Sequence, residues 1–149
     1  MRLSPQPSTK NTSFVWATPS FFATTAFISL SPSAVRCAKF AVSNGTVAAQ
    51  TKKLRLSGLG ALMDGVFLSE QLGAEKPSPV FFDQVFDAIP PVSKAQVMIV
   101  GDSLTSDMRG GNNAGIVTCW YNPEGLKAPE DLRIDHDIRD LHEVYGLLK

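Results

Sequence analysis

The sequence predicts an α/β fold in which a parallel sheet is covered by helices on both faces. Apolar runs and helical patterns alternate along residues 37–149. The strand-like runs are continuously apolar rather than alternating, as in residues 96–100, where four apolar residues follow Gln96. This pattern is typical of parallel strands that are buried on both sides. A chain of 149 residues is long enough for one domain with a hydrophobic core.

The individual elements follow from the spacing of apolar residues and from the glycines and prolines between them. The expected strands are residues 39–42, 66–68, 96–100 and 116–120, and the expected helices are residues 46–57, 79–89, 106–114 and 140–148. The helices at 79–89 and 140–148 place their apolar residues on one face. Pro79 favours a helix start and Pro90 a helix end, so the bounds of the helix between them are well marked.

Residues 1–36 differ in composition from the rest of the chain. They are rich in Ser, Thr and Pro, and no acidic residue precedes Asp64. Three interpretations are open: we favour a non-native leader fused to a gene fragment, then a targeting peptide, and third a strand at residues 21–30 that completes the sheet. The expected domain organisation is therefore a leader over residues 1–36 and a partial α/β core over residues 37–149.

Bulk composition excludes several classes of function. The formal net charge is zero, so we expect no nucleic-acid or membrane-surface partner. The apolar stretch at residues 14–30 is interrupted by proline and polar residues, which argues against a membrane span. Cys37 and Cys119 lack the spacing of a zinc site or a disulfide framework, and His136 and His142 are expected to be solvated or packed. Cytoplasm is the default localisation.

An acidic motif follows the expected strand at residues 96–100. Asp102 stands at the tip of this apolar run, and Asp107 follows five residues later. Magnesium prefers hard oxygen ligands and usually keeps several waters, so a direct carboxylate from Asp102 and a supporting one from Asp107 would suit Mg²⁺. The alternative is that Asp102 caps the helix that begins near Thr105, since aspartate is a common N-cap residue.

Two further segments could hold an anion. Ser43, Asn44 and Gly45 follow the first expected strand and offer a hydroxyl and backbone N–H groups, although the same residues are also the usual ones of a polar turn. Lys76 precedes the helix at residues 79–89 and could neutralise a phosphate or a neighbouring carboxylate. Taken alone it is equally consistent with a solvated lysine.

The order and spacing of these segments resemble the second, third and fourth motifs of the haloacid dehalogenase-like (HAD) phosphohydrolases. By this resemblance, Ser43 binds phosphate, Lys76 steadies the phosphoryl group and the nucleophile, Asp102 binds the metal and Asp107 supports it. The resemblance covers about residues 37–149. It implies a three-layer Rossmann-like core and Mg²⁺ as cofactor.

Longer stretches resemble one branch of that family, the pyrimidine 5′-nucleotidases. They are residues 67–77, residues 101–115 and residues 118–123. The resemblance implies Mg²⁺-dependent hydrolysis of nucleoside 5′-monophosphates through an aspartyl-phosphate, so the implied partner is a small phosphorylated substrate.

The family's first motif, which supplies the nucleophilic aspartate in a DxD pattern, is not found. No acidic residue precedes Asp64, and around Asp64 the position of the nucleophile is taken by Leu62. This stretch also follows Ser43, which is the wrong order, and it aligns better with the linker before the next strand. The helical cap that follows the first motif is not identified either. We therefore expect a truncated phosphatase fragment that is inactive on its own.

Without the first-motif strand, the expected sheet has a gap between the strands that end at Ser43 and at Asp102. Unless residues 21–30 fill it, the uncovered edges should favour self-association. Two other functions stay open. One is a phosphate- or nucleotide-binding module without catalysis, and the other is a phosphatase completed by a partner that adds the missing strand.

Overall fold

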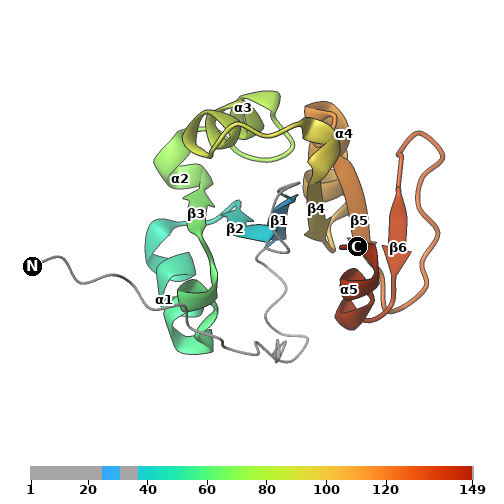
Figure 1. Ribbon diagram of the computed structural model, residues 1–149, viewed down its shortest axis with the longest axis horizontal. Coiled ribbons are helices and arrows are strands. Elements are labelled where there is room, and N and C mark those ends of the chain that lie inside the picture. The colour runs from blue at the N-terminus through green and yellow to red at the C-terminus, as the bar shows by residue number, and fades with distance from the viewer. Residues whose placement is uncertain (1–24, 31–36, 149) are drawn as a thin grey trace, which may run out of the picture.

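A single six-stranded sheet organises the protein. The computed structural model describes the backbone of residues 25–30, and it describes residues 37–148 with their side chains. The strands are β1 (Thr25–Leu30), β2 (Cys37–Ser43), β3 (Gly65–Leu68), β4 (Val97–Gly101), β5 (Val117–Tyr121) and β6 (His136–Ile138). Their order across the sheet is β3-β2-β1-β4-β5-β6 (Figure 1). All neighbours are parallel except the two pairs that β1 makes.

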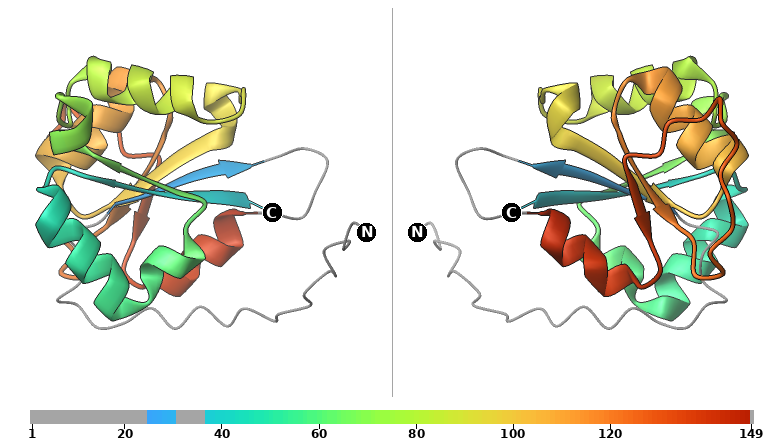
Figure 2. Two further views of the ribbon diagram at one scale, coloured as in Figure 1. Left: turned by 90° about the vertical axis from the view of Figure 1, so that its left-hand side faces the viewer. Right: turned by 90° about the vertical axis from the view of Figure 1, so that its right-hand side faces the viewer.

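Helices cover both faces of the sheet, which confirms the three-layer α/β fold. They are α1 (Val47–Ser57), α2 (Ser69–Leu72), α3 (Pro79–Ala88), α4 (Arg109–Ala114) and α5 (Val144–Leu147). Figure 2 shows α3 and α4 on one face and α1 and α5 on the other. Within the described residues no helix is long and apolar enough to cross a membrane.

The hydrophobic core has two parts, one on each side of the sheet. Phe81, Phe82 and Val85 of α3 are almost completely buried, and they pack with Val42 and Ile99 of the sheet. On the other side, α5 and the turn before it pack on the central strands; this cluster comprises Met98, Val100, Cys119, Ile138, Leu141 and Val144. Burial on both sides explains why the parallel strands β4 and β5 are continuously apolar in sequence.

β1 occupies the position at which the sequence predicted a gap. Thr25 pairs with Val42 of β2, and Ala26 pairs with Val100 of β4, both in antiparallel register. The third alternative for the N-terminal segment, a strand that completes the sheet, is therefore the one found for Thr25–Leu30. Residues 1–24 lie outside the described part of the chain. Because β1 lies between β2 and β4, the sheet has no gap at this position. Self-association through uncovered sheet edges stays a prediction.

Several elements differ from the sequence prediction, among them the short helix α2, which was not predicted. The helix predicted at residues 106–114 begins earlier, with a π-helical turn over Leu104–Met108, because the Ser103 side chain accepts a hydrogen bond from Ser106 N at 3.2 Å and so caps this turn. The helix predicted at 140–148 is divided into a 3₁₀ turn, Leu141–Glu143, and α5. β6 was not predicted, since three residues at a sheet edge show no apolar run.

Gly111 packs where α4 meets the sheet, and we expect Gly111→Ala to destabilise the protein. A Cβ at this position would lie 2.7 Å from a methyl carbon of Ile99 and 2.7 Å from one of Thr118. Both side chains are completely buried, so neither can move away easily. Urea denaturation should show a loss of about 1–3 kcal/mol, which exceeds the 0.5–1 kcal/mol or so that a helix gains when alanine replaces glycine.

The matched control for this prediction is Gly146→Ala in α5. Nothing lies within 4 Å of a Cβ built at Gly146, so this variant should be as stable as the parent chain or slightly more stable. A Gly111→Ala variant that behaves like Gly146→Ala would show that α4 does not pack closely on β4 and β5.

Cys119 should be unreactive in the folded protein. Its side chain is completely buried on β5, and burial, with smaller contributions from Glu143 and Asp137, raises the pKa of its thiol to about 12. Because the thiolate is the reactive species, Ellman's reagent at about pH 8 should modify at most Cys37, which is half-buried at the start of β2. Unfolding should expose both thiols, and labelling of Cys119 in folded Cys37→Ser would contradict the prediction.

Candidate active site

The predicted site residues lie at one edge of the sheet, where β2 and β4 end. Ser43 is the last residue of β2, and Asp102 directly follows β4. The register of β1 places the ends of these strands on its two sides, since Thr25 pairs with Val42 and Ala26 with Val100. In α/β sheets ligands bind at the carboxyl ends of the parallel strands, so the topology brings the separate motifs together.

A buried ion pair joins the segment that contains Lys76 to the acidic motif that follows β4. Lys76 Nζ lies 2.7 Å from Asp107 Oδ1, and each side chain is only 3% exposed. The same ammonium donates a hydrogen bond to the carbonyl oxygen of Val42 at 3.0 Å. Lys76 therefore connects the end of β2 to the turn that follows β4, and it is not a solvated lysine.

Asn44 fixes the backbone of Lys76. Its side-chain amide donates to the Lys76 carbonyl oxygen at 2.7 Å, and its side-chain oxygen accepts from the Lys76 N–H at 2.8 Å. This pair of hydrogen bonds satisfies both polar groups of the Lys76 main chain. The turn after β2 therefore has a specific role, which is to hold Lys76 in register with the strand.

Asp107 also binds the backbone at the start of its own turn. Its Oδ2 accepts from Ser103 N at 3.2 Å, while Oδ1 accepts from Lys76. This approach requires a glycine at position 101, because a Cβ there would lie 2.4 Å from Asp107 Oδ2. Both carboxylate oxygens of Asp107 thus have partners, and its supporting role at a metal stays a prediction.

Asp102 is the exposed carboxylate of the site. The alternative in which it caps the following helix is not found, since Ser103 caps that turn. Burial of part of the side chain raises the pKa of Asp102, and the negative charge of Asp107 adds to this effect. For Lys76, burial lowers the pKa, and the attraction of Asp107 opposes this shift without cancelling it.

The acceptor set suits a cation that is shared with a phosphate. Every Asp, Glu, His and Cys of the sequence falls within the described ranges, and these ranges contain no group of three such residues that could hold a metal ion. Mg²⁺ is commonly held by one or two carboxylates together with substrate phosphates and water. Asp102 fits this arrangement as a direct ligand, whereas Asp107 is already occupied by Lys76 and Ser103.

Two further contacts at the site, like those of Asn44, were not predicted. Trp120 of β5 donates its indole N–H to the Asp102 carbonyl oxygen at 3.0 Å. Glu70 of α2 accepts from Val47 N at 2.5 Å and so occupies a donor in the first turn of α1. No local pattern signals such contacts, because each joins elements that are distant in sequence. Asp64, the first acidic residue of the sequence, lies elsewhere. It precedes β3 and accepts from Lys39 N at 2.7 Å.

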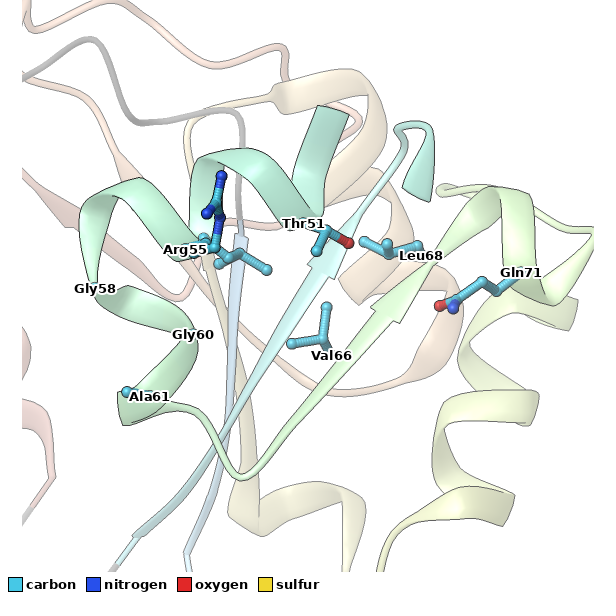
Figure 3. A pocket seen from close by; sticks show the side chains of 9 residues that line it. Thr51, Arg55, Gly58, Gly60, Ala61, Val66, Leu68 and Gln71 are labelled. Atoms are coloured by element: carbon cyan, nitrogen blue, oxygen red, sulfur yellow. The ribbon is translucent and has the colours of Figure 1, made fainter. Parts of the chain in front are cut away.

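A cavity of about 510 Å³ lies apart from these residues, beside the edge strand β3 (Figure 3). It is bordered by α1, the turn that follows it, β3 and α2, and its lining residues are Thr51, Leu54, Arg55, Gly58, Gly60, Ala61, Val66, Leu68 and Gln71. None of the site residues described above is among them. The site is therefore separate from this cavity.

Comparison with known proteins agrees with this geometry. Residues 73–144 match the family model described as HAD-hydrolase-like. This part of the chain belongs to the HAD-like hydrolases. Within this HAD-like part lie Lys76, Asp102 and Asp107, so the family match includes the buried ion pair and the exposed carboxylate. The superfamily predicted from the motifs is therefore confirmed.

Individual relatives support the same family. The putative HAD-hydrolase YfnB of Bacillus subtilis is 40% identical over 109 residues, which are 73% of this chain and 46% of that protein. The pyrimidine 5′-nucleotidase PynA of Streptococcus pneumoniae is 47% identical over 109 residues, again 73% and 46% of the two chains. The pyrimidine 5′-nucleotidase YjjG of Escherichia coli is 35% identical over 107 residues, 72% of this chain and 48% of that one.

Solved structures give the same result. The crystal structure of YfnB bound to magnesium superposes with a TM-score of 0.72 at 40% identity, covering 74% of this chain and 48% of that chain. A 2-haloacid dehalogenase from Pseudomonas syringae pv. Tomato has a TM-score of 0.64 at 28% identity, covering 73% of this chain and 45% of that one. The HAD-like chain thus spans about half the length of the curated relatives it matches.

The buried ion pair leads to a stability prediction. Lys76→Met would leave the Asp107 charge buried without its partner, so we expect the free energy of unfolding to fall by about 3–5 kcal/mol. The matched control is Arg109→Met. Arg109 and Asp131 are also 2.7 Å apart, but their side chains are 39% and 69% exposed, so the loss should stay below about 1 kcal/mol. Equal losses in urea denaturation would mean that burial of the Lys76–Asp107 pair is unimportant.

Proposed function

We propose that this HAD-like chain binds phosphate monoesters, with nucleoside 5′-monophosphates as the preferred class, together with Mg²⁺. The single observation that carries the proposal is the placement of the Lys76–Asp107 pair between the ends of β2 and β4, with the exposed Asp102 beside it. Relatives named pyrimidine 5′-nucleotidases, at 47% and 35% identity, support this class of ligand.

In this proposal each side chain has a separate task. Ser43 and the turn after β2 contact the phosphate, Lys76 supplies positive charge beneath it, and Asp102 holds the cation. Asp107 keeps Lys76 in place and does not touch the ligand, because its side chain is only 3% exposed. A bound Mg²⁺ would supply neutralisation of the phosphate charge.

We further propose that the 149-residue chain does not hydrolyse the phosphate ester. Hydrolysis through an aspartyl-phosphate needs a carboxylate nucleophile in addition to the metal ligand. The strand between β2 and β4 is β1, whose sequence TAFISL contains no acid and whose direction is opposite to that of its neighbours. Of the carboxylates at this edge, Asp102 is left for the cation, Asp107 holds Lys76, and Glu70 accepts from Val47 N.

Calorimetry with cytidine 5′-monophosphate and MgCl₂ tests the binding. We expect measurable heat from the parent chain and its loss in Asp102→Asn, because the neutral amide cannot replace the carboxylate as a cation ligand. Asp131→Asn is the control, since Asp131 is an exposed carboxylate paired with Arg109 away from the site. Absence of heat with the parent chain would contradict the binding proposal.

An assay of phosphate release tests the second part separately. The purified chain should release no inorganic phosphate from cytidine 5′-monophosphate beyond the rate found for Asp102→Asn. Release that depends on Asp102 would show that the chain is an active phosphatase.

A further inference from the structure

The peptide group between Asp102 and Ser103 is held from both sides. Its carbonyl oxygen accepts from the indole N–H of Trp120 at 3.0 Å, and its N–H donates to Asp107 Oδ2 at 3.2 Å. A peptide group is planar, so fixing its oxygen and its nitrogen fixes the orientation of the whole plane. The direction in which the neighbouring Asp102 side chain leaves the backbone is restricted as a result.

Trp120 is itself rigidly placed. Its side chain is only 3% exposed and belongs to the core cluster that contains Phe81 and Ile99. In the sheet it pairs with Gly101, the last residue of β4. The indole is therefore anchored by packing, and its one polar group is directed at the point where the chain leaves the sheet to form the site.

The other side of the peptide is connected to β2. Asp107 accepts from Lys76 at 2.7 Å, and Lys76 donates to the Val42 carbonyl oxygen at 3.0 Å. A continuous series of hydrogen bonds thus joins β5, the end of β4 and β2, and Trp120 is its end on β5. Contacts of this kind, one step behind a metal ligand, orient the ligand before the metal binds.

We propose that Trp120 is a positioning residue for cation binding, which holds the Asp102–Ser103 peptide so that the exposed Asp102 carboxylate is oriented toward the cation in advance. The inference rests on the proposed function, in which Asp102 holds Mg²⁺. Trp120 touches neither the cation nor the phosphate in this proposal.

The test is the affinity of the full chain for MgCl₂ alone, measured by calorimetry. Trp120→Phe keeps an aromatic ring in the core but removes the N–H donor. We expect Mg²⁺ binding to weaken about fivefold, the factor that corresponds to the loss of one hydrogen bond worth about 1 kcal/mol. Val97→Ala is the control for general destabilisation, because Val97 is completely buried at the opposite end of β4. Its Mg²⁺ affinity should equal that of the parent.

A measurement on the parent chain keeps the inference testable if Trp120→Phe does not fold. The indole ¹⁵N–¹H resonance of Trp120 can be told from that of Trp16 with Trp16→Phe. We expect it to shift on addition of MgCl₂, with the dissociation constant found by calorimetry, and not to shift in Asp102→Asn. A resonance that stays in place while Mg²⁺ binds would overturn the inference.

The outcomes separate this inference from the proposed function. If Trp120→Phe and Val97→Ala weaken Mg²⁺ binding equally, or if neither does, the positioning role is wrong while the cation site at Asp102 stands. If the parent chain binds no Mg²⁺, or binds it equally well as Asp102→Asn, the cation site and the inference both fail.

Discussion

Two opposite charges lie beneath the surface at the edge of the sheet, and much of the local structure serves to compensate them. The Lys76 ammonium and the Asp107 carboxylate are each 3% exposed, and an unpaired charge at that depth would be strongly unfavourable. The ammonium donates to Val42 O, and the carboxylate accepts from Ser103 N. The Asn44 side chain hydrogen-bonds both polar groups of the Lys76 backbone. The pair therefore joins the end of β2 to the turn after β4, across β1, and Asp107 also accepts from the N–H of Ser103, the residue after Asp102.

Sequence alone predicted the elements whose apolar residues repeat clearly. Residues 39–42, 66–68, 96–100 and 116–120 each fall on a strand, and Pro79 marks the start of α3. The sequence around β1 predicts a strand only as the third of three interpretations, and pairing with β2 and β4 on its two sides makes it a central strand. β6 and the π-helical turn depend on tertiary contacts and on one serine cap, which periodicity does not report.

In the site, too, features with a clear sequence pattern could be predicted, and those that depend on tertiary contacts could not. Lys76, Asp102 and Asp107 could be recognised because their order along the chain is distinctive, and the structure brings Lys76 and Asp107 into direct contact. The use of the Asn44 side chain to hold Lys76, and of the Trp120 indole to hold Asp102, could not be predicted. Both are long-range hydrogen bonds whose donors and acceptors are ordinary residues of a turn and a strand.

The central position of β1 affects where a domain boundary can be placed in this chain. The family match covers residues 73–144, and the resemblance drawn from motifs begins near residue 37. A boundary placed by similarity at either position would discard Thr25–Leu30 and, with it, the strand pairing that joins β2 to β4. A domain boundary for this chain therefore has to include Thr25–Leu30, which lies at the centre of the sheet.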